Sequence, residues 1–204
     1  LEPLFEMELP TRASPEGIAD PGFAQTVKIV TSLRDHAEKR GWAIRVGGVG
    51  VPEYVEGSGR ITSRDCVDWQ EQPKDHFCEL TGFPWIVESD IRCAAKAEAQ
   101  VGVGVGKKSI VFVTVSTGIS SCLVINGEPW AGARGSAIGL GMIPAIYGDD
   151  SLTLEEFASG LGLARRYNGE AAVQVASAKD INQLAETDPA AVKVLATSGE
   201  SLGA

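Results

Sequence analysis

The sequence predicts a mixed α/β fold, and two observations support that prediction. Short apolar and β-branched runs bounded by glycine, proline or polar residues are typical of strands, and they concentrate before residue 126. From Thr153 onward the chain shows mostly helical signals, and Asp188-Pro189 opens the last predicted helix. Strand signals therefore come first along the chain, and helical signals dominate later.

The elements can be assigned in order. In the first part we expect a strand at 4–9, a helix from the N-cap Asp20 and Pro21 to Gly41, a strand at 43–46, a polar loop over 53–72 and a helix around 74–81. The next part is expected to hold a strand at 84–87, a helix that opens at Asp90, and strands at 110–115 and 122–125. The dipeptide Asn126-Gly127 then predicts a tight hairpin turn.

Two strand ends carry residues suited to phosphoryl transfer. The first strand, Pro84 to Val87, runs into Asp90 at the start of an Ala-rich helix, and a carboxylate in that place can accept a proton from an alcohol. The second strand ends at Ser116-Thr117-Gly118, and such a turn can offer hydroxyl and backbone N–H groups to a phosphate. Together they suggest phosphoryl transfer to an alcohol.

These segments resemble the ROK family (repressors, open reading frames, kinases), which comprises bacterial sugar kinases and sugar-responsive regulators. Ser89-Asp90 matches the Asn-Asp pair that opens the family's Ala-rich helix, with Ser89 in place of the Asn. Residues 116–120 match its Gly-Thr-Gly-Ile-Gly phosphate turn, residues 125–133 resemble its hairpin, and residues 154–160 resemble its Leu-Glu-x-Tyr-Ala-Ser-Gly helix. A weaker likeness extends upstream over 49–69, so the motifs follow the family order through most of the chain.

The resemblance implies an actin-like/hexokinase (ribonuclease H-like) fold, of which residues 1–104 are the remainder of the N-terminal lobe and residues 105–204 the incomplete start of the C-terminal lobe. It implies that Asp90 is the catalytic base. By the same resemblance, the residues that hold phosphate are Ser116, Thr117 and Gly118, and those that bind sugar are Ser89, Asp90 and Glu155. The residues alone favour a helix N-cap for Asp90, and for Glu155 a complement to the helix dipole beside the cap Thr153. The turn could equally be an ordinary strand end.

The chain also departs from the family pattern. Where the family's Gly-Glu-Ile-Gly-His supplies a sugar-binding Glu and a His for sugar and zinc, residues 138–142 read Ile-Gly-Leu-Gly-Met. The Cys-rich zinc loop is absent from 147–153, so we expect no zinc and no other metal site. The family's Asp-x-Gly-Gly-Thr phosphate loop has no match in 1–15, and its late Gly-Gly adenosine motif would lie beyond Ala204. The sequence is therefore expected to be the middle of a ROK-like protein.

Composition narrows the classes of partner. At 44% apolar residues the chain can bury one or two cores, and its net charge of −9 argues against direct nucleic-acid contact. No apolar run approaches the roughly 20 residues that span a bilayer, and the start lacks the basic region of a signal peptide. The four scattered cysteines are expected as cytosolic thiols, with a disulfide left open. A cytoplasmic location and a possible homo-oligomer complete these expectations.

A glycine-rich stretch at 102–109 resembles a P-loop only superficially. Val101 stands where the motif needs its first Gly, and Lys108 stands at the Ser/Thr position that would hold magnesium. We therefore interpret the stretch as a turn between lobes.

Two functions remain open at this point. The first is a ROK-type sugar kinase, in which the intact parent transfers phosphate from ATP, with Mg²⁺, to a sugar hydroxyl; this chain alone is expected to be inactive and to bind nucleotide poorly. The alternative is the sugar-sensing effector domain of a ROK-type transcriptional regulator. Retention of Asp90 favours the kinase, whereas Gly139 and Met142, which replace the family's Glu and His, favour altered sugar recognition.

Overall fold

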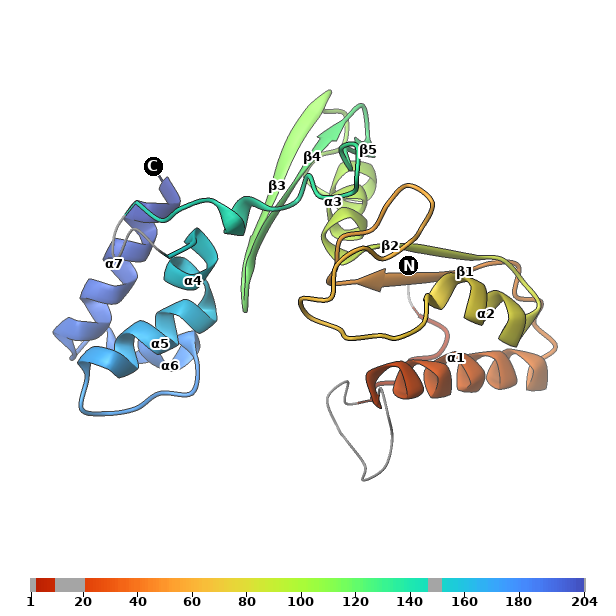
Figure 1. Cartoon of the computed structure of the whole chain (residues 1–204), viewed down its shortest axis with the longest axis horizontal. Coiled ribbons are helices and arrows are strands. Elements are labelled where there is room, and N and C mark those ends of the chain that lie inside the picture. The colour runs from red at the N-terminus through yellow and green to blue at the C-terminus, as the bar shows by residue number, and fades with distance from the viewer. Residues whose placement is uncertain (1–2, 10–20, 147–151, 204) are drawn as a thin grey trace. The chain divides into compact units, whose positions relative to one another are not determined.

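The computed structural model describes residues 3–9, 21–146 and 152–203 (Figure 1). The chain divides into two compact units, each with its own core. Unit 1 comprises Leu1–Cys93 and Ala131–Ser136, and unit 2 comprises Ala94–Trp130 and Ala137–Ala204. The later short segment 131–136 thus returns to the unit that the first 93 residues build.

Unit 1 is built on two parallel strands with helices beside them. Its elements are α1 (Pro21–Lys39), β1 (Gly47–Val51), α2 (Pro73–Thr81), β2 (Trp85–Ser89) and the first turn of α3 (Asp90–Val101). β1 and β2 pair in register from Gly47 opposite Trp85 to Val51 opposite Ser89. One core cluster joins the helices to β2 through Phe23, Val30, Phe77 and Trp85, and a second lies among Val51, Val55 and Val87.

The helices of unit 1 follow the prediction. α1 begins at Pro21 and stops before Gly41, which adopts φ 69°. The prediction of Asp20 as N-cap falls outside the described residues. α2 matches the helix predicted around 74–81, and the preceding loop over 53–72 is irregular except for one bridge between Val55 and Ile61.

Two predicted strands of unit 1 are wrong. Residues 4–9 form no strand; Phe5 instead stacks on His36 of α1, with ring centroids 4.1 Å apart. Residues 43–46 are also irregular, and the strand begins at Gly47, where a side-chain Cβ would overlap the ring of Trp85. The ring of Trp85 leaves no room for a side chain at residue 47, so only glycine fits there. Because glycine has low strand propensity, the sequence did not indicate a strand at this place.

Unit 2 opens with the rest of α3 and an antiparallel hairpin. β3 (Ser109–Val115) pairs with β4 (Ile119–Ile125), and a two-residue β5 (Glu128–Pro129) pairs with the end of β4. The predicted turn at Asn126-Gly127 is confirmed, because both residues have positive φ, 52° and 81°. The strands begin slightly earlier than the sequence predicted.

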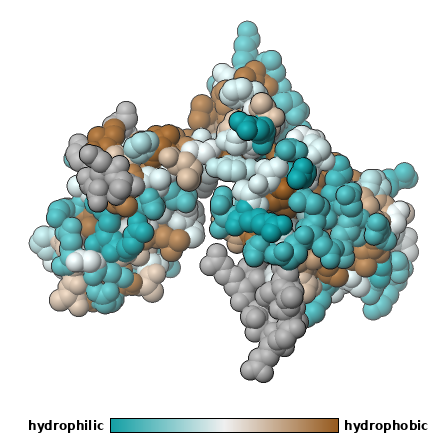
Figure 2. Space-filling model, in the orientation of Figure 1, coloured by the Kyte–Doolittle hydropathy of each residue, from teal (hydrophilic) through white to brown (hydrophobic). Residues whose placement is uncertain are grey.

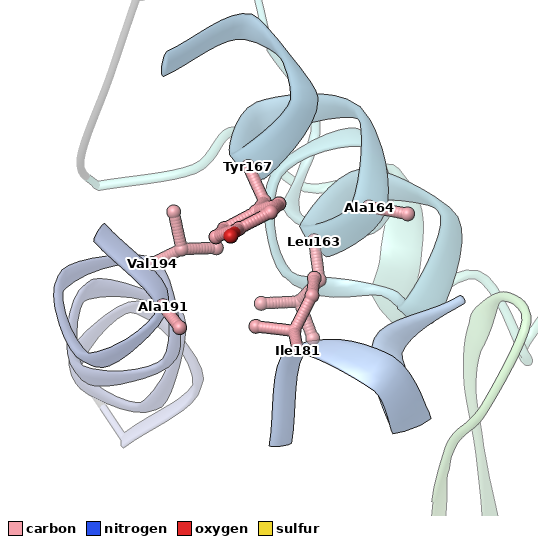
Figure 3. Packing of buried hydrophobic residues seen from close by; sticks show 6 residues of the cluster. All are labelled: Leu163, Ala164, Tyr167, Ile181, Ala191 and Val194. Carbon is pink, nitrogen blue, oxygen red and sulfur yellow. The ribbon is translucent and has the colours of Figure 1, made fainter. Parts of the chain in front are cut away.

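The rest of unit 2 is helical, as predicted from Thr153 onward. It contains the 3₁₀ turn η1 (Leu140–Met142) and the helices α4 (Leu154–Ala158), α5 (Gly160–Glu170), α6 (Ala178–Leu184) and α7 (Pro189–Gly203). Tyr167 lies at the centre of the helical core, among Leu163, Ala164, Ile181, Ala191 and Val194 (Figure 3). A second cluster, made by Ile119, Leu154, Phe157 and Ala158, joins the start of β4 to α4. Hydrophilic and hydrophobic residues intermingle on the visible surface (Figure 2).

Candidate functional site

The carboxyl edge of the β1–β2 pair carries the predicted base. Both strands are parallel, so their C-terminal ends meet at one edge, which is where α/β proteins commonly bind ligands. β2 ends at Ser89 and α3 begins at Asp90 without an intervening loop. β1 approaches closely, because a Cβ on Gly50 would lie 3.5 Å from the Cα of Asp90. The start of α3 therefore lies beside the end of β1.

Ser89 is buried with an unused hydroxyl. The residue has 0% exposure, and within the described part of the chain its Oγ has no hydrogen-bond partner. Buried hydroxyl groups are nearly always hydrogen-bonded, so such a group calls for a water or a polar ligand. The family Asn that Ser89 replaces has a longer side chain with more hydrogen-bonding atoms.

Asp90 keeps much of its surface in solvent, but the atoms packed around its carboxyl shift the pKa. Partial burial raises the pKa of Asp90 above its usual value, and the nearby charge of Glu53 adds to the rise, although the backbone N–H groups of Ile91 and Asp90 oppose it. Asp90 Oδ1 accepts a hydrogen bond from the Ile91 N–H at 2.7 Å. A carboxylate with a raised pKa holds a proton more readily, which suits a general base. The Ile91 contact also satisfies one free amide at the helix start, so this carboxylate serves the helix as well.

Arg92 fixes the first turn of α3 from the buried side, and sequence reasoning missed it. The residue is 1% exposed and donates hydrogen bonds to Glu88 and to the backbone carbonyl oxygens of Val55 and Gly135. Gly135 has φ 75°, and a Cβ there would overlap the carbonyl of Val55. The spacing of Glu88 and Arg92, four residues apart, was the available signal, but the two carbonyl partners of Arg92 are 37 and 43 residues away.

Unit 2 brings the predicted phosphate turn and Glu155 together. The turn 116–118 is closed by a hydrogen bond from the Ser116 N–H to the Gly118 carbonyl at 2.8 Å, and the Gly160 N–H donates to the Ser116 carbonyl at 2.7 Å. Glu155 Oε2 accepts a hydrogen bond from the Ile119 N–H at 2.6 Å. A Cβ on Gly118 would lie 2.5 Å from that oxygen. Glycine at 118 therefore leaves room for the carboxylate beside the turn.

Thr153 caps α4 as the sequence indicated, but the carboxylate that completes the cap is that of Glu156 rather than Glu155. Thr153 Oγ1 accepts from the Glu156 N–H at 3.2 Å, and Glu156 Oε2 accepts from the Thr153 N–H at 2.9 Å, which is a capping box. These hydrogen bonds hold the pKa of Glu156 below its usual value. Glu155 is left to bind the start of β4, so its carboxylate faces the turn rather than the helix end.

The segment that replaces the family's sugar and zinc residues forms η1. Gly139 precedes η1 and Met142 ends it, with 63% of Met142 exposed. Of the loop 147–153, which lacks the family's cysteines, residues 147–151 lie outside the described residues. Among residues 3–9, 21–146 and 152–203, no group of three His, Cys, Asp or Glu side chains is placed to hold a metal ion.

The glycine-rich stretch after α3 forms a turn and lies within unit 2, whereas its interpretation as a turn between lobes stays a prediction. The N–H groups of Gly102 and Gly104 donate to the Glu98 carbonyl, and the Val103 N–H donates to the Glu98 carboxylate at 3.1 Å. These amides are engaged within the turn, so they are not presented to a phosphate as in a P-loop.

The predicted site residues thus fall into two groups. Ser89 and Asp90 adjoin each other in unit 1, and Glu155 adjoins the turn 116–118 in unit 2. Convergence of the two groups on one ligand stays a prediction.

In the described part of the chain, no helix is long and apolar enough to cross a lipid bilayer.

Comparison with known proteins finds sequences and structures similar to this chain among sugar kinases and a transcriptional regulator. A glucokinase of Halalkalibacterium halodurans is 33% identical over 127 residues, which is 58% of this chain and 38% of that enzyme. A ROK family glucokinase from Streptomyces griseus, solved with glucose and AMPPNP, superposes with a TM-score of 0.66 at 23% identity, over 86% of this chain and 65% of its own. A ROK family transcriptional regulator, a homologue of the E. coli MLC protein, superposes with a TM-score of 0.73 at 21% identity, over 91% of this chain and 51% of its own.

These likenesses confirm the predicted fold class. The mixed α/β chain has the actin-like fold of the ROK hexokinases and glucokinases, and it spans less than two thirds of the length of those relatives. The family resemblance drawn from the motifs is confirmed as well, since the model of the ROK family matches residues 12–204. The chain belongs to the ROK family.

Proposed function

We propose that this chain forms the central part of a ROK-type sugar kinase, whose intact parent transfers the γ-phosphate of ATP to a sugar hydroxyl. The observation that carries the proposal is the edge of unit 1, where Asp90, with its raised pKa, follows the buried and unpartnered hydroxyl of Ser89. A proton acceptor beside an unused hydroxyl suits a ligand that is itself an alcohol. The kinase names of the relatives support the same reaction class.

In this mechanism each group has one role. Asp90 accepts the proton of the sugar hydroxyl while the oxygen of that hydroxyl bonds to the γ-phosphorus. The bond from that phosphorus to the β–γ bridging oxygen breaks, and ADP leaves. The backbone of the turn 116–118 holds a phosphate, and Glu155 orients the sugar. The Mg²⁺ that accompanies ATP would neutralise phosphate charge. The proposal keeps the lobes at 1–104 and 105–204, with the protein in the cytoplasm, where ATP is available.

The chain by itself is not expected to turn over ATP with any sugar. Its sugar affinity should be millimolar or weaker, equivalent to at most about 4 kcal/mol, since Gly139 and Met142 supply neither the carboxylate nor the imidazole of the family. A coupled assay on residues 1–204 tests the first statement. Turnover that Asp90→Asn abolishes would contradict it.

Sugar binding is tested with variants of the unpartnered hydroxyl. Ser89→Ala should leave the free energy of unfolding nearly unchanged, because that hydroxyl makes no hydrogen bond in the described structure, but it should weaken hexose binding measured by NMR shifts or calorimetry. Ser198→Ala is the matched control and should not change hexose binding, since Ser198 is also buried but its hydroxyl accepts a hydrogen bond from Arg166 at 2.8 Å in unit 2, outside the predicted site residues. If neither Ser89→Ala nor Asp90→Asn changes the binding of any hexose, the proposed sugar site is wrong.

The alternative is a sugar-sensing effector domain of a regulator. The structural likeness to the MLC homologue and the loss of the Glu and His at Gly139 and Met142 favour it. The gene of the parent decides between the two functions. A phosphate loop encoded upstream favours the kinase, and a helix-turn-helix encoded there favours the regulator.

A further inference from the structure

Glu53 is a buried carboxylate that the proposed reaction does not use. It lies two residues beyond the end of β1 and is 3% exposed. Burying an ionised carboxylate is unfavourable unless hydrogen bonds replace its water. The surroundings of Glu53 therefore have to supply donors, and they supply four.

The four donors come from one loop. Glu53 Oε1 accepts from the N–H groups of Cys66 and Val67 at 2.6 and 2.7 Å, and Oε2 accepts from the Asp65 N–H at 3.1 Å and from the Ser63 hydroxyl. Three successive backbone amides that point at one anion form a nest of the kind that binds phosphate. Here a carboxylate of the chain itself occupies the nest.

The ionised form of Glu53 is the one that this loop stabilises. Burial alone would raise the pKa of Glu53, but the hydrogen bonds from Ser63 and from the amides of Val67, Cys66 and Asp65 outweigh it, and the pKa lies below its usual value. Glu53 is therefore an anion at neutral pH, and the loop 63–67 is tied to a fixed negative charge.

That charge lies at the edge of the sheet where Asp90 begins α3. Val51, two residues before Glu53, is paired with Ser89, the residue before Asp90. The negative charge of Glu53 contributes to the raised pKa of Asp90, so the two carboxylates interact electrostatically. Glu53 therefore lies at the same edge as the predicted base, and the same carboxylate holds the loop 63–67.

We propose that Glu53 is a positioning residue of the Asp90 site, whose buried carboxylate holds the loop 63–67 in one conformation at the edge where the base lies. The part of this inference that concerns the Asp90 site rests on the proposed function. A loop fixed before binding avoids the entropy cost of ordering it around a ligand. Because Glu53 fills the amide nest, the N–H groups of residues 65–67 are not offered to a phosphate.

The test replaces the charge and keeps the shape. Glu53→Gln turns an acceptor oxygen into an NH₂ group that faces backbone donors, so hydrogen exchange at the amides of 65–67 should quicken roughly tenfold or more. The pKa of Asp90, followed by the carboxyl ¹³C shift, should fall because a neighbouring negative charge is gone. Glu56→Gln is the matched control on the same loop, and it should change neither quantity.

A second variant covers the case in which Glu53→Gln fails to fold. Ser63→Ala removes one donor and leaves the carboxylate, so exchange at 65–67 should quicken by a smaller factor with the fold retained. The proposal is overturned if hydrogen exchange at 65–67 is unchanged in both variants. It is also overturned if the pKa of Asp90 in Glu53→Gln equals that in the unmutated chain. Neither measurement needs a sugar or a nucleotide, so failure of the proposed function would leave the result of this test intact.

Discussion

Replacement of Arg92 by methionine should destabilise unit 1 strongly. The variant Arg92→Met keeps an unbranched apolar stem but removes the donors to the carbonyls of Val55 and Gly135, both in buried residues. Two charged hydrogen bonds at about 1.5–3 kcal/mol each give a loss of about 3–5 kcal/mol, after allowance for the relieved cost of burying a guanidinium. The pair with Glu88, whose side chain is 40% exposed, adds at most about 1 kcal/mol.

Urea unfolding followed by tryptophan fluorescence measures this loss. Three of the four tryptophans, Trp42, Trp69 and Trp85, belong to unit 1, so the signal reports mainly on that unit. With a slope of about 2 kcal/mol per molar urea, the midpoint should fall by about 2 M.

Two further variants control the comparison. Arg92→Lys keeps the charge without the planar fork and should lose about half as much stability. Arg45→Met changes an exposed position of the same unit, and its free energy of unfolding should stay within about 0.5 kcal/mol of that of the unmutated chain. If the free energy of unfolding of Arg92→Met is within about 1 kcal/mol of that of the unmutated chain, the buried hydrogen bonds do not stabilise unit 1 as argued.

Three other predictions concern separate parts of the chain. Gly135→Ala should lower the melting temperature markedly, because its Cβ would overlap the Val55 carbonyl at φ 75°, whereas Gly57→Ala, with open space around it, should not; equal melting curves would speak against the close approach. The Tyr167 hydroxyl donates to Asp188 and lowers the pKa of that carboxyl, so the stability it contributes should be complete above about pH 4 and lost as the pH falls through the folded-state pKa. Tyr167→Phe should make acid unfolding less steep below pH 4, and identical slopes would exclude this linkage. Metal analysis after dialysis should find no stoichiometric zinc, and one zinc per chain would show that the family's zinc residues have been misaligned.

Local signals in the sequence were sufficient for much of the fold. The turn at Asn126-Gly127 was predictable because its two residues alone decide the backbone conformation. The start of the last helix was predictable for a similar reason, since Asp188 caps the amide of Ala190 two residues later. The motif order around Asp90 then supplied the family, which composition and periodicity could not.

Features that depend on distant contacts were missed. The strand at Gly47 was placed too early because only the ring of Trp85, across the sheet, explains why glycine suits a strand there. Arg92 resembled a surface residue of an Ala-rich helix, and nothing nearby in sequence indicates its two carbonyl partners. Glu53 lay in a stretch that was correctly expected to be a polar loop, but loop polarity does not reveal that three amides converge on one carboxylate.

The return of residues 131–136 to unit 1 has a consequence for synthesis of the protein. The carbonyl of Gly135 that Arg92 requires is made 43 residues after Arg92 itself. When the chain up to residue 93 has emerged from the ribosome, Arg92 is exposed but its buried partner, the Gly135 carbonyl, has not emerged. The nascent unit is expected to wait, partly open, until the hairpin and the segment after it emerge, and chaperones should engage it in that interval. A stalled-ribosome series that ends before and after residue 136 would show the step.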